Sequence, residues 1–332
     1  MKVIIRLKEI FGIYLKRMTR KAIIISISGT SLTRSETNIL KNEKPWGIIL
    51  FKRNIQSENQ LKHLTKNIKK VMKDEKFPIL IDEEGGRVTR LNNFLNNSFY
   101  SQRFFGEMYK IDKAICARIY RTYINSISQV LIKTGININT SPVLDLARNN
   151  THKIIGNRSY SKDPRIINDL GKLCVQFYKS NKIASVIKHI PGHGAANLDS
   201  HLRLPKVKNN IRSLKETDFK CFKNIPSFFA MTAHILYTSI DKKNNATHSK
   251  KLIKMFIRKE LGFKGILISD DISMKALKYD LSKNADYALK AGCNLVLYCS
   301  GKTSELRKLL KTIPYIDKFT AKKTSEFYKF LS

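Results

Sequence analysis

The chain has 332 residues, and 62 lysines and arginines against 26 aspartates and glutamates give it a formal net charge of +36. This length suits one large domain with a sizeable core. The five cysteines are odd in number and form no C-x-x-C pair, which excludes a disulfide framework and cysteine-bound zinc and fits the cytoplasm.

The excess of positive charge has two interpretations. Clustered lysine and arginine would indicate binding to nucleic acid or to an anionic surface. In this chain the lysines are scattered among abundant asparagine and isoleucine, and no zinc finger or RNP sequence occurs. We therefore favour compositional drift and predict no specific nucleic-acid partner.

Residues 1–20 are predicted to be a basic extension ahead of a single catalytic domain over residues 21–332. Cations interrupt the apolar residues too often for the hydrophobic core of a signal peptide. An amphipathic surface helix and a dispensable extension both remain open for this segment. No run of 18 uncharged apolar residues occurs anywhere, so no transmembrane helix is predicted.

From residue 22 onward, apolar runs rich in β-branched residues alternate with amphipathic segments. Such runs predict parallel strands that are buried on both faces. They are Ile23–Ile27, Trp46–Phe51, Pro78–Ile81, Ile136–Val143, Ile183–Ile187, Phe228–Thr232, Gly265–Ile268 and Asn294–Leu297. Helical periodicity marks Gln60–Lys73, Ala114–Lys133 and Asp169–Asn181. The alternation favours the α/β class and a single (β/α)8 barrel of the TIM type, with a doubly wound sheet as the alternative.

Nearly every predicted strand ends in polar or charged residues. The carboxyl ends of barrel strands meet at one mouth, so these groups are expected to share a pocket. Its carboxylates would be Asp82, Asp145, Asp270 and Asp271, its imidazoles His189, His193, His201 and His234, and its cations Arg90, Arg158 and Lys188.

The segment 188–201 holds three of the seven histidines. His189 and His193 have the spacing of a helical zinc pair, but Pro191 and Gly192 lie between them. Proline inside a helix removes a hydrogen bond and clashes with the preceding turn. We therefore predict neither a metal nor another cofactor.

No phosphate-binding loop, dinucleotide fingerprint or nucleophile elbow occurs in the sequence. A dense set of donors and acceptors suits a sugar, and glycoside hydrolysis needs a nucleophile or base together with an acid. Asp270 or Asp271 would supply the carboxylate, because only one of two adjacent strand residues points into the pocket. The other would cap or brace a helix that begins over residues 273–277. His201, with Asp199 two residues before it, forms a plausible acid dyad.

Six motifs, in order from about Thr19 to Cys299, resemble those of the bacterial cytoplasmic β-N-acetylglucosaminidases of glycoside hydrolase family 3. They are Gly47–Asn54, Asp82–Arg90, Ser141–Asp145, Ile155–Arg158, Lys188–His201 and Ser269–Met274. Glu83 stands for the usual glutamine of the second motif, which adds an ionisable group near the predicted site and leaves the pH optimum open. Ile190 for phenylalanine and Ser159-Tyr160 for Ala-Phe are the other departures.

The resemblance implies a role for each matching residue. Asp270 would be the nucleophile that forms a covalent glycosyl-enzyme, and His201 the acid/base catalyst, oriented by Asp199. The N-acetylglucosamine ring would be bound by Asp82, Arg90, Arg158, Lys188 and His189. His193 would either contact the ligand or brace the loop.

The implied substrate is a small carbohydrate from cell-wall turnover, N-acetylglucosamine linked to an anhydro-muramoyl peptide. It would be cleaved in the cytoplasm with retention of anomeric configuration, by an enzyme that we expect to be a monomer. Two alternatives remain. A histidine in place of a second carboxylate would repel attacking phosphate less, which would allow phosphorolysis, and a basic barrel could simply bind anionic polymers.

Overall fold

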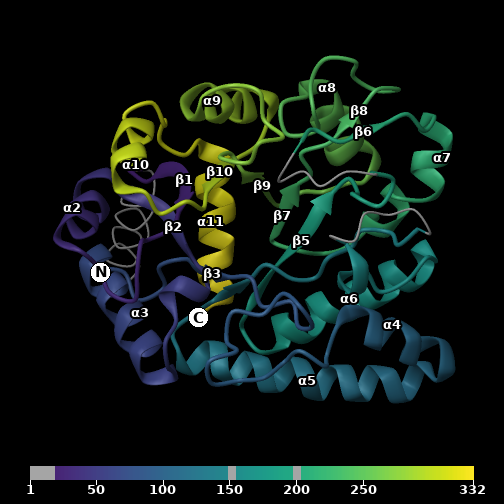
Figure 1. The fold of residues 1–332 in the computed structure, drawn as a ribbon, viewed down its shortest axis with the longest axis horizontal. Coiled ribbons are helices and arrows are strands. Elements are labelled where there is room, and N and C mark those ends of the chain that lie inside the picture. The colour runs from purple at the N-terminus through teal and green to yellow at the C-terminus, as the bar shows by residue number, and fades with distance from the viewer. Residues whose placement is uncertain (1–18, 149–154, 197–202) are drawn as a thin grey trace, which may run out of the picture.

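The computed structural model describes residues 19–148, 155–196 and 203–332 (Figure 1). Eight parallel strands close into a barrel in the order β1-β10-β9-β7-β5-β4-β3-β2. They are β1 (Lys21–Ile25), β2 (Pro45–Leu50), β3 (Ile79–Ile81), β4 (Ile138–Asn139), β5 (Ala184–Ile190), β7 (Phe229–Thr232), β9 (Ile266–Asp271) and β10 (Leu295–Tyr298). Closure confirms the predicted barrel and excludes the open doubly wound sheet.

Each predicted run overlaps one strand of the barrel, but β4 is much shorter than the predicted run over residues 136–143. After Asn139 the regular strand stops, although the Thr140 N–H still donates to the Ile81 carbonyl at 2.8 Å. Pro142 has no N–H to offer a neighbouring strand, so pairing cannot continue regularly through it. Val143 then forms an isolated bridge with Lys188.

Helices surround the barrel on its outside (Figure 1). They are α2 (Arg34–Glu43), α3 (Glu58–Met72), α4 (Gln102–Ile111), α5 (Lys113–Lys133), α6 (Pro164–Ser180), α7 (Ile211–Glu216), α8 (Lys250–Leu252), α9 (Leu281–Ala291), α10 (Thr303–Leu310) and α11 (Lys318–Phe330). Short 3-10 turns occupy Lys52–Asn54, Gly156–Arg158 and Phe219–Phe222, and a π-helix runs over Ile253–Glu260. A small two-stranded sheet joins β6 (Lys206–Val207) to β8 (Leu236–Tyr237).

The three helices predicted from periodicity are confirmed as α3, α5 and α6, and each begins earlier than predicted. Their starts are set by capping residues, because Ser57, Asp112 and Asp163 each accept a backbone N–H of the following turn. Pro164 at the first position of α6 adds a backbone angle suited to a helix start.

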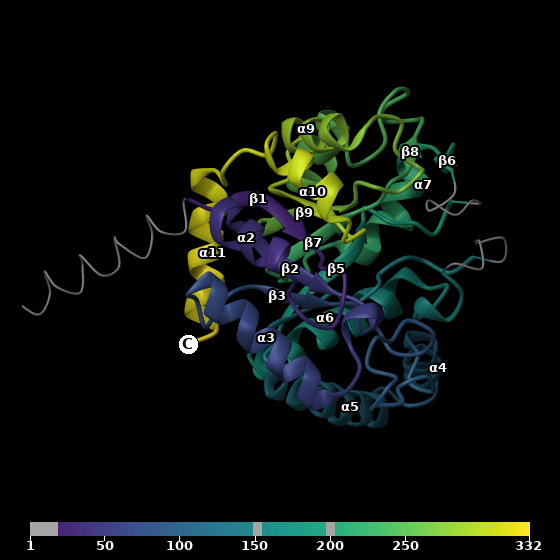
Figure 2. The ribbon, with the colours of Figure 1, turned by 60° about the vertical axis from the view of Figure 1, so that its left-hand side comes forward.

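Helix α11 covers the N-terminal end of the barrel, as Figure 2 shows beside β1 and β2. Trp46 at the start of β2 donates its indole N–H to Thr324 Oγ1 at 2.9 Å. The Phe327 ring lies 5.3 Å from that of Phe229, at the start of β7, and 6.4 Å from that of Trp46. All three rings are buried, so this end of the barrel is filled by side chains.

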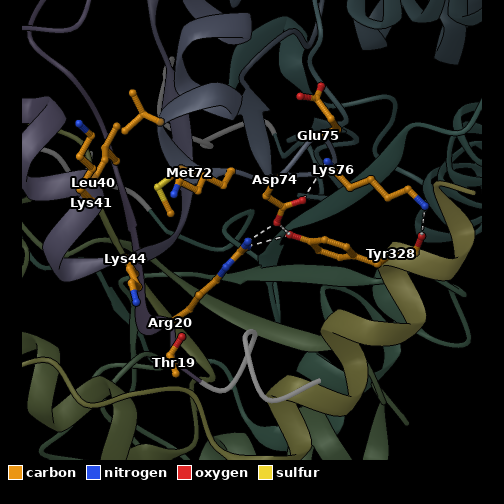
Figure 3. Close-up of a pocket in the computed structure, with 12 residues that line it drawn as sticks. Thr19, Arg20, Leu40, Lys41, Lys44, Met72, Asp74, Glu75, Lys76 and Tyr328 are labelled. Carbon is orange, nitrogen blue, oxygen red and sulfur yellow. Dashed lines mark hydrogen bonds and ion pairs between the residues drawn. The ribbon is translucent and has the colours of Figure 1, made fainter. Parts of the chain in front are cut away.

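A cavity of about 830 Å³ lies at the same end, next to the starts of the first strands (Figure 3). Arg20, the last residue of the predicted extension, is buried there and pairs with Asp74. Its guanidinium also donates to the phenolic oxygen of Tyr328 at 2.8 Å, and that hydroxyl donates to Asp74 at 2.7 Å. Arg20, Asp74 and Tyr328 bond to one another and hold α11 against the N-terminal end of the barrel. We therefore assign these three side chains of the cavity a structural role.

Candidate active site

A second cavity, of about 430 Å³, lies where the strands end on the opposite side of the barrel. Its polar lining residues are Asp82, Glu84, Arg87, Arg90, Arg158, Lys188, His189, Asp270 and Asp271. Ile49, Met231 and Leu297 supply apolar surface from β2, β7 and β10. Six of the eight predicted site residues therefore meet in one pocket. The other two, Asp199 and His201, lie outside the described residues.

Five ionised side chains of alternating sign form one wall of the pocket. Arg90 Nη2 donates to Asp82 Oδ2 at 3.0 Å, and Lys188 Nζ donates to Asp82 Oδ1 at 3.1 Å. Lys188 Nζ also lies 2.6 Å from Glu84 Oε1. Arg158 binds the Glu84 carboxylate through two nitrogens, at 2.7 and 2.8 Å. We call this set the ion row.

The cations of the ion row keep its two carboxylates ionised. Burial alone would raise the pKa of Asp82, but Lys188 and Arg90 outweigh that effect and hold it well below its usual range. For Glu84, burial likewise opposes ionisation, and Arg158 and Lys188 lower its pKa to about 2. Three cations face two anions, so the row carries a net positive charge near neutral pH.

Residues 82–84 alternate in direction as they leave β3. Asp82 and Glu84 line the pocket, whereas Glu83 is buried behind it with 1% of its surface exposed. The expected ionisable group therefore lies near the site, but behind the pocket and not in its lining. Burial raises the pKa of Glu83, and hydrogen bonds only partly offset this effect.

Asp145 was expected to line the pocket, but it is fully buried behind His189. Its Oδ2 lies 2.7 Å from His189 Nδ1, and its Oδ1 accepts the His193 backbone N–H at 2.7 Å. Asp145 thus orients His189 and fixes the start of the following loop. His193 is 4% exposed and does not line the pocket either, which favours the bracing role over ligand contact.

Asp270 and Asp271 end β9 and both contact the pocket. The Asp271 carboxylate accepts the backbone N–H of Ser273 at 3.0 Å and its hydroxyl at 2.7 Å, so it braces the turn as a structural acceptor. The predicted helix start at 273–277 is wrong, because these residues form turns and α9 begins at Leu281. Asp280 provides the cap there, accepting from the Lys283 N–H.

His234, also expected in the pocket, is fully buried beneath this strand end. Its Nε2 donates to the Asp271 carbonyl at 3.0 Å, and its Nδ1 accepts from the Thr247 hydroxyl at 2.7 Å. Burial lowers its pKa, which favours this neutral form. His234 therefore supports the backbone that carries the two aspartates.

Across residues 19–148, 155–196 and 203–332, no three acidic, histidine or cysteine side chains are grouped so that they could hold a metal ion. In the same ranges, no helix is long and apolar enough to cross a membrane.

The profile of the glycosyl hydrolase family 3 N-terminal domain matches residues 17–322. A β-hexosaminidase of Nitrosomonas eutropha is 31% identical over 85% of this chain and 81% of its own length. Another, from Methylobacillus flagellatus, is 32% identical over 89% of this chain and 85% of its own. The chain belongs to glycoside hydrolase family 3.

Solved structures agree with this assignment. NagZ from Neisseria gonorrhoeae in complex with N-trifluoroacetyl-D-glucosamine is 28% identical, with a TM-score of 0.84 over 95% of this chain and 90% of that one. A family 3 β-N-acetylglucosaminidase from Paenibacillus is 26% identical, also with a TM-score of 0.84, over 96% of this chain and 62% of that one. This family 3 hydrolase is thus an enzyme of the β-N-acetylhexosaminidase type.

Two charged lining residues of this family 3 hydrolase are missing from the residues predicted from its sequence. Glu84 links Lys188 to Arg158, and Arg87 lies at the rim of the pocket. Glu84 follows Asp82 by two positions, and strand alternation would have placed both carboxylates on one side. Arg87 lies beyond a turn through two glycines, where no such periodicity applies.

Acidification should destabilise this family 3 hydrolase through two buried histidines. Burial lowers the pKa of both His193 and His248 to about 4, so the unfolded chain binds more protons below pH ~6.5. For His193 alone the free energy of unfolding should fall by about 3 kcal/mol between pH 7 and pH 4. We expect Tm, followed by circular dichroism, to drop over this range.

The variant His248→Gln tests the origin of the drop in Tm at a residue that does not line the pocket. Its curve of Tm against pH should be shallower than that of the wild type. A parallel curve would show that His248 does not contribute.

Proposed function

We propose that this protein is a retaining exo-β-N-acetylglucosaminidase. Its substrates would be peptidoglycan-turnover fragments, from which it removes terminal N-acetylglucosamine linked to anhydro-muramoyl peptide. The observation that carries this proposal is the placement of Asp270 in the same pocket as the ion row. The sugar analogue named with the gonococcal protein supports the choice of an N-acetylated glucosamine.

In the proposed reaction, a carboxylate oxygen of Asp270 attacks C1 of the sugar while the bond from C1 to the glycosidic oxygen breaks. The leaving oxygen takes a proton from the acid catalyst, and a covalent glycosyl-enzyme remains. Water then attacks C1, gives its proton to the same catalyst and releases Asp270. Two inversions at C1 retain the configuration. His201 is proposed as that catalyst, with Asp199 orienting it, on the resemblance of their motif alone.

The ion row suits the hydroxyl groups of a sugar. A hydroxyl both donates and accepts hydrogen bonds, so it can donate to a carboxylate such as Asp82 and accept from a neighbouring cation such as Arg90 or Lys188. Arg158 and His189 face the same cavity and complete the proposed ring of contacts. Bonds to ionised groups are stronger than neutral ones, which favours firm orientation of the ring.

We propose that the enzyme acts as a monomer in the cytoplasm. All five cysteines are free thiols, and four of them are buried, which fits a reducing compartment.

Release of 4-nitrophenol from its β-N-acetylglucosaminide and β-glucoside tests the proposed function. We expect hydrolysis of the first substrate, much slower hydrolysis of the second, and β-N-acetylglucosamine as the first anomer seen by NMR. Added phosphate should neither accelerate the reaction nor yield a sugar 1-phosphate, and either effect would indicate a phosphorylase. Absence of activity on both glycosides and on purified anhydro-muropeptides would contradict the proposal.

A further inference from the structure

Glu83 lies directly behind the pocket, and its backbone is held in place from β4. The Glu83 N–H donates to Asn139 Oδ1 at 3.0 Å, and its carbonyl accepts from Asn139 Nδ2 at 2.8 Å. Both residues are buried, so this pair of bonds is shielded from water. The barrel therefore fixes where the Glu83 side chain starts.

The Glu83 carboxylate in turn holds the segment that carries Arg90. Its Oε2 accepts the backbone N–H of Arg90 at 2.8 Å and that of Leu91 at 3.2 Å, while Oε1 accepts from Asn97 Nδ2 at 2.9 Å. In the described part of the chain Glu83 forms no ion pair, and its polar contacts are these hydrogen bonds together with the nearby Thr89 hydroxyl, which lowers the Glu83 pKa. Every one of them falls on the loop after β3.

This loop contributes several groups to the pocket. Arg90 reaches Asp82 at 3.0 Å, and Arg87 lines the rim. Removing the acceptor at Glu83 would leave two backbone N–H groups without a partner, one of them on the fully buried Leu91. A buried unsatisfied donor is costly, so the segment would have to shift to reach another acceptor.

We propose that Glu83 is a positioning residue, whose carboxylate sets the backbone of the Arg90 segment and through it the guanidinium that contacts Asp82. The consequence for catalysis rests on the proposed function, since Arg90 is there a sugar-binding group. The effect of Glu83 on the backbone of the loop does not depend on the proposed function.

The test compares Glu83→Met, which keeps the side-chain length but lacks an acceptor, with Glu83→Gln, whose amide oxygen can still accept both backbone N–H groups. With the 4-nitrophenyl N-acetylglucosaminide, Glu83→Met should raise KM about tenfold and change kcat by less than about threefold. Glu83→Gln should restore KM to within about threefold of the wild type. A wild-type KM in Glu83→Met would overturn the proposal.

Glu36 offers a matched control, because it is also a buried carboxylate that accepts two backbone N–H groups, from Ser28 and Thr33. It lies outside the pocket lining, so Glu36→Met should leave KM unchanged even where it lowers Tm. An equal rise of KM in both methionine variants would mean a general loss of stability and would contradict a positioning role.

A double-mutant cycle with Arg90→Ala asks whether Glu83 acts through Arg90. If it does, Glu83→Met should add little to the KM of the Arg90→Ala enzyme, whereas multiplied effects would overturn the proposal. Asn97→Ala, which removes only the contact to Oε1, provides a milder variant should Glu83→Met not fold, and should raise KM about two- to threefold. An unchanged KM there would count against the proposal.

Hydrogen exchange supplies a readout that does not depend on activity. The amides of Arg90 and Leu91 should exchange faster in Glu83→Met than in Glu83→Gln, while those of β9 stay protected in both. If the wild type cleaves no glycoside, the proposed function fails but the exchange result still decides whether Glu83 holds the segment. Equal exchange rates in the two variants would refute the claim that the Glu83 carboxylate fixes the Arg90 segment.

Discussion

Replacing Asp270 by asparagine should reduce release of 4-nitrophenol from the β-N-acetylglucosaminide by about 10⁴-fold or more, since loss of the proposed nucleophile would remove the proposed covalent route. The amide is nearly isosteric with the carboxylate, so Tm should change little. Initial rates at saturating substrate measure the loss. The smaller variant Asp270→Gly should regain activity with added azide and yield the α-glycosyl azide, because azide then attacks C1 from the vacated side.

Asp271→Asn is the matched control for this experiment. Asp271 also contacts the pocket, but its carboxylate accepts from Ser273 and from the Cys299 N–H at 3.2 Å. Loss of such bonds should reduce activity by no more than about a hundredfold, and azide should not restore it. If Asp271 variants showed the larger loss and the azide product, the nucleophile would be Asp271.

Replacing Lys188 by methionine should have the second largest effect, on stability and binding together. Lys188 is 3% exposed and lies between Asp82 and Glu84, so its loss leaves two buried carboxylates facing each other with less compensation. Breaking a buried ion pair in this way costs about 3–5 kcal/mol. Urea unfolding should show that loss, and kcat/KM should fall at least about a hundredfold.

Adding Glu84→Gln to the Lys188→Met variant shows whether the charges of Lys188 and Glu84 are energetically coupled. Removing one carboxylate relieves the repulsion created by Lys188→Met, so the double variant should be more stable than the sum of the single effects by about 1–3 kcal/mol. Activity should not return with it, because the Lys188 ammonium is still missing. Additive losses of stability would show that the ion row is not one coupled unit.

The barrel could be predicted from the sequence because strands buried on both faces leave continuous β-branched runs such as Ile183–Ile187. Parallel order then brings the strand ends together, which explains why six predicted residues share the pocket. Strand order predicts which residues lie at the mouth of the barrel. It does not predict how deeply each side chain is buried there. Asp145 lies in an irregular segment after β4 and is buried behind His189, and the period of a strand does not apply to such a segment.

The incorrect prediction at residues 273–277 has a related cause. Ser273 and the apolar residues after it resemble a helix start, but the Asp271 carboxylate already binds both the N–H and the hydroxyl of Ser273. This local bonding stabilises a turn, and α9 begins only after Asp280. For Glu83 the motif indicates an ionisable group, and its direction away from the pocket follows from alternation with Asp82 and Glu84, while Asn139 holds its backbone N–H.

Packing of α11 across the base of the barrel has a consequence for the order of events in a reaction cycle. With Trp46, Phe229 and Phe327 filling that end, side chains close the base of the barrel, opposite the pocket at the strand ends. A pocket over a closed base would admit the tip of a saccharide and not its middle, which would suit the proposed removal of terminal units. In the proposed two-step reaction, substrate and both products would then pass on the side of the strand ends, so the aglycone would have to depart before water reaches the glycosyl-enzyme.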